Sequence, residues 1–366
     1  MAFRLPEYIA PNFNEERFTS APDVRTEPAP DDCIAPENYH ATSIYPEYFK
    51  INGRWIMAAR SRMDCVAVPG GGNRIAIKEF RKLKKGDKVV IGRTEDGSEG
   101  VYVHENGFEK KNGTRDKFAF RTGDSRETSK AWDYDRLYDI LKHDRRNGYI
   151  VWVLGPAACF DKDARESMTG LIEHGYVHAV LAGNALATHD LEGAVYKTAL
   201  GQDIYTRQSR QCGHYHHLDI LNRARQAGSI EELIGTGQVT NGIIHACIKK
   251  GVPLVLAASI RDDGPLPEVV TDTRRAQDDM REHTSRATTV IALATQLHSI
   301  AAGNMTPSYH VAGQTVRPVY FYAVDMSEFV LNKLKDRGSL EVVTIAANVH
   351  DFLFILKRGL LEVKEK

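Results

Sequence analysis

The sequence lacks a net charge, because its 366 residues include 48 lysines and arginines against 48 aspartates and glutamates. No bulk positive field is available to neutralise the phosphates of a nucleic acid or the surface of an anionic membrane. Long apolar runs are also missing: the longest, such as 252–260, are far shorter than the roughly 20 residues that cross a bilayer. With 42% apolar residues and a mean hydropathy of −0.38, the composition is typical of a globular protein. We therefore expect neither nucleic acid nor a membrane as its partner.

Cysteine is scarce and shows no pairing pattern. The five cysteines are widely spaced, odd in number and without a CxxC pair, which fits reduced thiols better than a disulfide framework. The first residues reach Pro6 and Glu7 without the apolar stretch of a secretory signal. Both features predict a cytoplasmic protein.

Proline is unevenly distributed, since seven of the fourteen lie in the first 46 residues. Each proline fixes φ and removes a hydrogen-bond donor, so residues 1–44 are predicted to form an extended arm that wraps another surface. Residues 45–129 contain short β-like runs separated by turn signals such as Gly70-Gly71-Gly72-Asn73, which indicate a small, mainly antiparallel β domain. Residues 130–366 are left for one larger domain.

In this larger region, apolar runs alternate with helical patterns. The runs are 150–154, 177–182, 253–259, 288–294, 319–324 and 342–347. They are nearly continuous, as expected of strands covered on both faces. Asp161 precedes a predicted helix that stops at Gly175, and Ser229 with Glu232 forms a capping box before another. The predicted fold class is α/β, with an open, parallel, six-stranded, doubly wound sheet.

Ligands of such a sheet bind beyond the carboxyl ends of its strands. The segments that follow the six runs are rich in small or polar residues, so polar groups from six loops converge on one edge; these segments include Gly155, Asn184, Ala185, Asp263, Thr295, Gln296, Leu297, His298, Asp325, Asn348 and Val349. Small residues let a pyrophosphate approach backbone N–H groups at helix N-termini, so the pattern favours a dinucleotide. The GxGxxG motif is lacking, however. Asp325 fits a ribose ligand and a helix cap about equally well.

Two further motifs at this edge suggest chemistry. Arg261-Asp262-Asp263 crowds one cation and two acids beside a Gly-Pro turn, which favours a ligand site over a structural Arg–Asp pair. His189 is followed by Asp190, which could be a base with its orienting acid, although Asp190 could equally cap a helix.

Three motifs have simpler interpretations. The segment from Cys212 to His217 resembles half a metal site, but further ligands with metal spacing are lacking, so we expect a polar loop and no metal. The glycines 70–72 predict a hairpin rather than a phosphate loop, because no helix follows them. Arg62 and Asp64 precede a β-like run and could bind substrate at the sheet edge or form a surface ion pair.

Four stretches, 181–190, 213–218, 259–267 and 294–305, resemble the archaeal-type ornithine cyclodeaminases. This family is also known as the domain associated with lysine-ketoglutarate reductase/saccharopine dehydrogenase. It also forms the carboxyl-terminal part of cyanobacterial arginine dihydrolase/ornithine cyclodeaminase fusions. The resemblance extends over about 45–361. It implies an NAD-binding domain of the deoxyhypusine-synthase type, which explains the missing GxGxxG, and a homo-oligomer.

The resemblance also implies a bound NAD contacted by Asn184, Ala185, Asp263, the residues 295–298, Asp325, Asn348 and Val349. The implied reaction converts L-ornithine to L-proline and ammonia without net redox change. In such a reaction a hydride leaves the α-carbon for NAD, the side-chain amine attacks the imine, ammonia departs, and the cyclic imine takes the hydride back.

The candidate residues for this chemistry fall into two groups. Asp262, His189 and His298 are candidates for the proton transfers. Arg261 or Arg62 would bind the substrate carboxylate, with Asp64 beside Arg62. Two alternatives stay open: a net NAD(P)-dependent amino-acid dehydrogenase or imine reductase, and a non-catalytic NAD-sensing module.

Overall fold

The computed structural model describes residues 4–108, 131–313, 315–335 and 339–362. The chain divides into two compact units. The first comprises Met1–Ser129, Asn304–Val319 and Gly338–Glu341, and the second comprises Lys130–Gly303, Tyr320–Arg337 and Val342–Lys366. Residues 1–44 therefore belong to the first unit rather than forming a separate arm. Residues 304–319 also belong to it, although the sequence placed them in the α/β domain.

The first unit is built from short antiparallel strands. Its elements are α1 (Glu16–Thr19), β1 (Arg25–Pro28), β2 (Glu47–Ile51), β3 (Arg54–Met57), β4 (Val66–Gly70), β5 (Arg74–Lys78), the 3₁₀ turn η1 (Phe80–Lys82), β6 (Lys88–Ile91), β7 (Val101–Val103), β14 (Tyr309–Ala312) and β15 (Thr315–Pro318). β4 and β5 pair in register from Val66↔Lys78 to Gly70↔Arg74, which confirms the predicted glycine hairpin.

Three observations show that the proline-rich residues pack within this unit. The strand β1 pairs with β6 along its whole length, and Phe18 is fully buried. Nζ of Lys50 donates to the carbonyl oxygens of Phe18 and Thr19, each at 3.0 Å. These contacts attach residues of the predicted extended arm to the strands of the first unit.

The second unit contains the remaining elements. They are α2 (Ala131–Asn147), β8 (Ile150–Leu154), η2 (Pro156–Cys159), α3 (Lys162–Glu173), β9 (Ala179–Gly183), α4 (Asn184–Tyr196), β10 (Thr198–Ala199), β11 (Gln202–Asp203), η3 (Gly213–Tyr215), α5 (His216–Ala227), α6 (Ile230–Gly235), α7 (Ile243–Lys250), β12 (Leu254–Ala257), α8 (Thr273–Thr284), β13 (Thr289–Leu293), α9 (Gln296–Met305), β16 (Tyr320–Asp325), α10 (Glu328–Lys335), β17 (Glu341–Ala346), α11 (Val349–Lys357) and the π-helix η4 (Arg358–Glu362).

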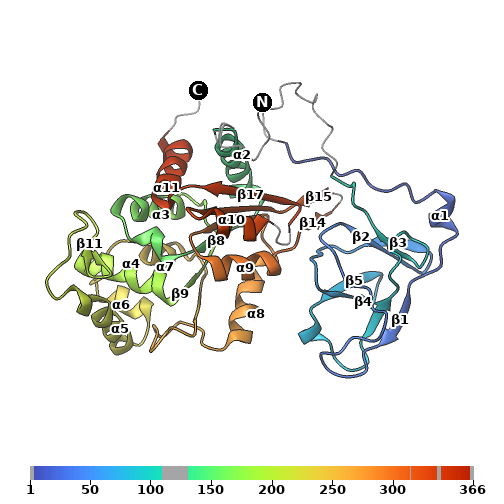
Figure 1. Ribbon diagram of the computed structural model, residues 1–366, viewed down its shortest axis with the longest axis horizontal. Coiled ribbons are helices and arrows are strands. Elements are labelled where there is room, and N and C mark those ends of the chain that lie inside the picture. The colour runs from blue at the N-terminus through green and yellow to red at the C-terminus, as the bar shows by residue number, and fades with distance from the viewer. Residues whose placement is uncertain (1–3, 109–130, 314, 336–338, 363–366) are drawn as a thin grey trace. The chain divides into compact units, whose positions relative to one another are not determined.

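Six of these strands form one sheet in the order β12-β9-β8-β13-β16-β17, with helices on both of its sides (Figure 1). The pairs from β12 to β16 are parallel, and every residue of β8 and β13 is buried. The predicted α/β fold class is therefore confirmed. In chain order the sheet reads 3-2-1-4-5-6, so the order reverses between β8 and β13, where ligands of such sheets bind.

Local signals account for the helix boundaries in this unit. Asp161 caps α3 by accepting from the N–H groups of Asp163 (2.9 Å) and Ala164 (3.2 Å). Oγ of Ser229 accepts from the Glu232 N–H at 3.0 Å at the start of α6, as the capping box predicts. Among the described residues, no helix combines the length and apolar character needed to cross a membrane.

Candidate functional site

A pocket lies where the strand order reverses, within the second unit. It is lined by residues from the ends of β8, β9, β12 and β13: Leu154, Gly155, Pro156, Gly183, Asn184, Ala185, Leu186, Ala257, Ser259, Arg261, Asp262, Thr295 and His298. Seven of the sequence-predicted site residues are therefore brought together here, namely Gly155, Asn184, Ala185, Arg261, Asp262, Thr295 and His298. Gly183, which ends β9, and Ser259, which follows β12, also line the pocket but were not among the predicted site residues.

The N-terminus of α4 opens into this pocket without a side-chain cap. Gly183 is the N-cap residue and makes no side-chain hydrogen bond, so the first N–H groups of the helix have no partner from a capping side chain. Gly183, Asn184 and Ala185 all line the pocket. A helix N-terminus of this kind, surrounded by small residues, is suited to bind a phosphate group.

Asn184 holds the start of α4 in place through a side-chain hydrogen bond. Its Oδ1 accepts from the Leu266 N–H at 3.0 Å, which connects the start of α4 to the loop after β12. In that loop, Oδ2 of Asp262 accepts from the Ser259 N–H at 2.6 Å. Within the described part of the chain Arg261 forms no ion pair with either neighbouring aspartate, and its side chain is exposed. The structural Arg–Asp pair considered from the sequence is therefore wrong.

His298 lies in the first turn of α9 and also lines the pocket. Its Nδ1 is 3.4 Å from Oγ1 of Thr295. Burial lowers the pKa of His298 below its usual value, and the nearby Asp262 carboxylate partly opposes this shift. The imidazole is therefore neutral near pH 7 and able to accept a proton.

The pocket residue Gly155, which follows β8, is in close backbone contact with Ala294, which follows β13. A Cβ added to Gly155 would lie 2.0 Å from the carbonyl oxygen of Ala294. Ala294 itself has φ of +45°, a left-handed conformation that costs a non-glycine residue about 1–3 kcal/mol and is typical of functional sites. This turn ends β13 one residue earlier than the apolar run predicts and directs Thr295 to the pocket.

The remaining predicted cofactor ligands do not line this pocket but lie at neighbouring strand ends. Asp325 ends β16 and accepts from the Ser327 N–H at 2.8 Å through Oδ1. It therefore makes a cap-like contact, and its second carboxylate oxygen is not used in that bond. Asn348 caps α11 by accepting from the His350 N–H at 2.9 Å, while Val349 is buried. Asp263, Gln296 and Leu297 are exposed.

The predicted pairing of His189 with Asp190 is wrong. Asp190 is fully buried and accepts from Nε of Arg165 at 2.6 Å and from the Ile244 N–H at 2.8 Å, so it caps α7. Nδ1 of His189 instead lies 2.8 Å from Oε2 of Glu192. Adjacent residues on a helix point about 100° apart, whereas residues three apart share a face, so sequence adjacency was misleading.

In the first unit, Arg62 is already engaged with protein groups. Its guanidinium lies 3.1 Å from Oε1 of Glu79, with both side chains about 15% exposed, and it also donates to the Asn304 carbonyl. Asp64 is exposed and has a left-handed backbone. The ion-pair alternative for Arg62 is therefore present in the structure.

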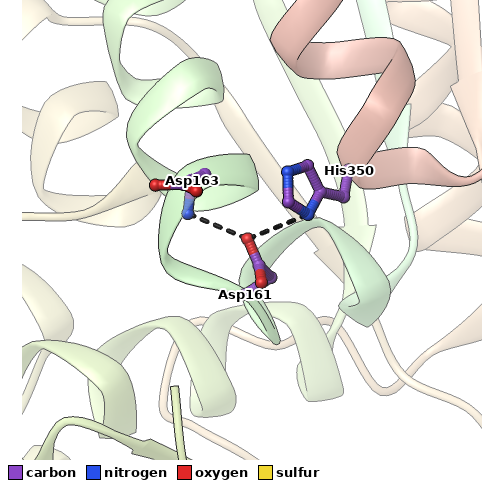
Figure 2. A group of neighbouring side chains, drawn as sticks. All are labelled: Asp161, Asp163 and His350. Carbon is purple, nitrogen blue, oxygen red and sulfur yellow. Dashed lines mark hydrogen bonds and ion pairs between the residues drawn. The ribbon is translucent and has the colours of Figure 1, made fainter. Parts of the chain in front are cut away.

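One group of described residues has ligand types and spacing that could suit a metal ion: Asp161, Asp163 and His350. Figure 2 shows Oδ1 of Asp161 between the Asp163 backbone N–H and Nδ1 of His350, which is 3.2 Å away. The other Asp161 oxygen accepts from Arg207 at 3.0 Å. Helix capping and the contacts of Asp161 with Arg207 and His350 explain this arrangement, which connects α3 to the start of α11.

The chain matches known proteins both in sequence and in structure. Residues 136–356 match the family model "Arginine dihydrolase ArgZ-like, C-terminal, Rossmann fold", and residues 46–131 match its "first region". The ornithine cyclodeaminase of Methanopyrus kandleri is 37% identical over 345 residues, covering 94% of this chain and 80% of the relative.

Two solved structures are similar as well. A conserved LOR/SDH protein from Methanococcus maripaludis S2 superposes with a TM-score of 0.84 at 36% identity, covering 93% of this chain and all of that one. The ternary complex of AgrE with ornithine and NAD⁺ gives a TM-score of 0.57 at 31% identity, covering 94% of this chain and 46% of that one.

Proposed function

This chain belongs to the ArgZ-like C-terminal family, whose relatives include named ornithine cyclodeaminases, and on that premise we propose that it is an NAD-dependent enzyme acting on an amino acid. The proposed reaction converts L-ornithine, or a related amino acid, to L-proline, or its analogue, and ammonia. The observation that carries the proposal is the pocket at the reversal of strand order, which unites predicted ligands from four strand ends.

The residues present fit a dinucleotide. Gly155, Gly183, Ala185 and Ala257 provide a pocket wall of small residues, and the uncapped N-terminus of α4 offers N–H groups to a phosphate. When bound, NAD would supply a hydride acceptor that can return the hydride later. The free oxygen of Asp325 is the proposed acceptor for ribose hydroxyls.

The protein's own groups would bind the amino acid and move its protons. Arg261 is exposed at the pocket and is the proposed ligand of the substrate carboxylate, because a guanidinium matches a carboxylate with two parallel hydrogen bonds. His298, neutral through burial, is proposed to keep the side-chain amine unprotonated for attack. Asp262, whose carboxylate accepts a hydrogen bond from the Ser259 N–H, is proposed to transfer a proton to the amino group that leaves as ammonia.

The test has two stages. Mass spectrometry of the ligand released from the denatured protein should detect NAD. Incubation of the holoenzyme with ornithine should then produce ammonia and proline in equal amounts, with no steady rise in NADH absorbance, because the cofactor is recycled. Steady NADH production would instead support a net dehydrogenase. Tight NAD without turnover of any of the common amino acids would support an NAD-sensing module.

A further inference from the structure

Four hydrogen-bond donors converge on the carboxylate of Glu192, which is fully buried on α4. Oε2 lies 2.8 Å from Nδ1 of His189 and 3.2 Å from the Leu200 N–H. Oε1 lies 2.8 Å from Oγ1 of Thr198 and 3.0 Å from the Gly201 N–H. These four hydrogen bonds compensate for the cost of burying a carboxylate away from water.

Glu192 is ionised in this environment. Burial by itself would raise its pKa, but the hydrogen bonds from His189, Gly201 and Thr198 together hold the pKa below its usual value. An ionised carboxylate can only accept hydrogen bonds. Each of the four partners must therefore direct a proton at Glu192.

This requirement determines where two imidazoles carry their protons. His189 must have a hydrogen on Nδ1, which leaves a lone pair on Nε2 of the neutral ring. Thr198 has one hydroxyl hydrogen and directs it at Glu192, so its oxygen must accept from Nδ1 of His216, 2.8 Å away. His216 is therefore also a Nδ1–H tautomer, fixed by the same carboxylate through Thr198.

His189 is not one of the residues that line the pocket, but it lies on α4 one turn after the helix start that does line it. It lies four residues after Ala185 and three after Leu186, both of which line the pocket, so it shares their face of the helix. Helical side chains lean toward the N-terminus, so the side chain of His189 is directed along α4 toward the turn that contains Ala185 and Leu186. His189 is 8% exposed, and its ring makes a T-shaped contact with the ring of Phe160 at a centroid distance of 5.5 Å.

We propose that Glu192 is a positioning residue of the site: it holds His189 as the Nδ1–H tautomer, so that Nε2 is the atom that accepts a proton during catalysis. Through Thr198 it holds His216 in the same tautomer. The catalytic part of this inference rests on the proposed function, whereas the tautomer assignment rests on the four hydrogen bonds to an ionised Glu192.

The first test uses the wild-type protein without substrate. Protein labelled with ¹⁵N-histidine is examined by two-bond ¹H–¹⁵N correlation spectra, and the two rings are assigned with His189→Gln and His216→Gln variants. We expect both rings to show a protonated Nδ1 and an unprotonated Nε2 at neutral pH. A protonated Nε2 on neutral His189 overturns the proposal.

Two variants then separate direct from indirect effects. Thr198→Val removes the hydroxyl that connects His216 to Glu192, and we expect His216 to lose its fixed tautomer while His189 keeps it. Glu192→Gln can donate as well as accept, so we expect His189 to lose its preference for Nδ1–H. If Glu192→Gln fails to fold, the wild-type spectrum and Thr198→Val still decide the assignment.

The kinetic readout concerns the holoenzyme. In folded Glu192→Gln we expect kcat to fall about 10²-fold, the scale of a lost proton-transfer group, with NAD content unchanged. An unchanged kcat together with an unchanged His189 spectrum refutes the role of Glu192. Wild-type spectra as expected, in a protein that turns over no amino acid, support the tautomer assignment and contradict the proposed reaction instead.

Discussion

Replacing Gly155 by alanine should damage the pocket through one steric contact. Gly155 has φ −85° and ψ 165°, which alanine adopts without strain, so backbone conformation is not the issue. The new Cβ would lie 2.0 Å from the Ala294 oxygen and 2.7 Å from its carbonyl carbon. Because Cβ atoms essentially never approach within 3.0 Å of another heavy atom, β8 and the turn at Ala294 must separate by about 1 Å.

Two effects are expected from this separation. Overpacking of this kind costs about 1–3 kcal/mol of unfolding free energy, measurable by urea denaturation. A displacement of about 1 Å can also cost about 10²-fold in catalysis, and NAD affinity measured by calorimetry should fall with it. Gly235→Ala is the matched control, because a Cβ there meets nothing within 4 Å, and it should be neutral or stabilising. Unchanged stability and NAD affinity in Gly155→Ala would refute the argument.

Three other perturbations test the site and the surrounding unit. Both Asp325→Ala and Asp325→Asn should lower the NAD content of the purified protein. Only Asp325→Asn should retain the stability of the folded protein, because it keeps an acceptor for the Ser327 N–H. Unchanged NAD content in both variants would contradict the ribose assignment. Asp262→Asn should lower turnover about 10²-fold with NAD still bound, and full activity would remove Asp262 from the mechanism. Burial lowers the pKa of His178, so the unfolded chain binds that proton more readily. Unfolding free energy should therefore decrease as pH falls through about 6.5, and less steeply in His178→Gln; identical slopes by urea denaturation would exclude this contribution.

The sequence predicted the backbone of the second unit closely. The six apolar runs coincide with β8, β9, β12, β13, β16 and β17 within a few residues, and the capping residues Asp161 and Ser229 act as expected. These features are encoded by neighbouring residues: strand runs by continuous apolar character and helix ends by side chains that reach their own backbone. For the same reason the sequence identified which residues follow each strand.

Contacts between distant segments were not predictable in this way. The hairpin of β14 and β15 was missed, and residues 1–44 were predicted to form an extended arm that wraps another surface, without the pairing of β1 with β6. Arg62 was a candidate substrate ligand, but its ion pair with Glu79 depends on how two loops of the first unit fold. Local spacing contains no information on which partner a strand or a long side chain will find.

The amino-acid sequence alone determined that this protein has a parallel α/β sheet and that small and polar residues follow its strands. Only the tertiary structure decided that the strand order reverses between β8 and β13, that Gly155 contacts Ala294, and that Glu192 rather than Asp190 is the partner of His189. The physical reason is that local sequence patterns specify single helices and strands, whereas the site is formed when those elements pack together. Packing brings residues more than 100 positions apart in the chain, such as Gly155 and His298, into one pocket.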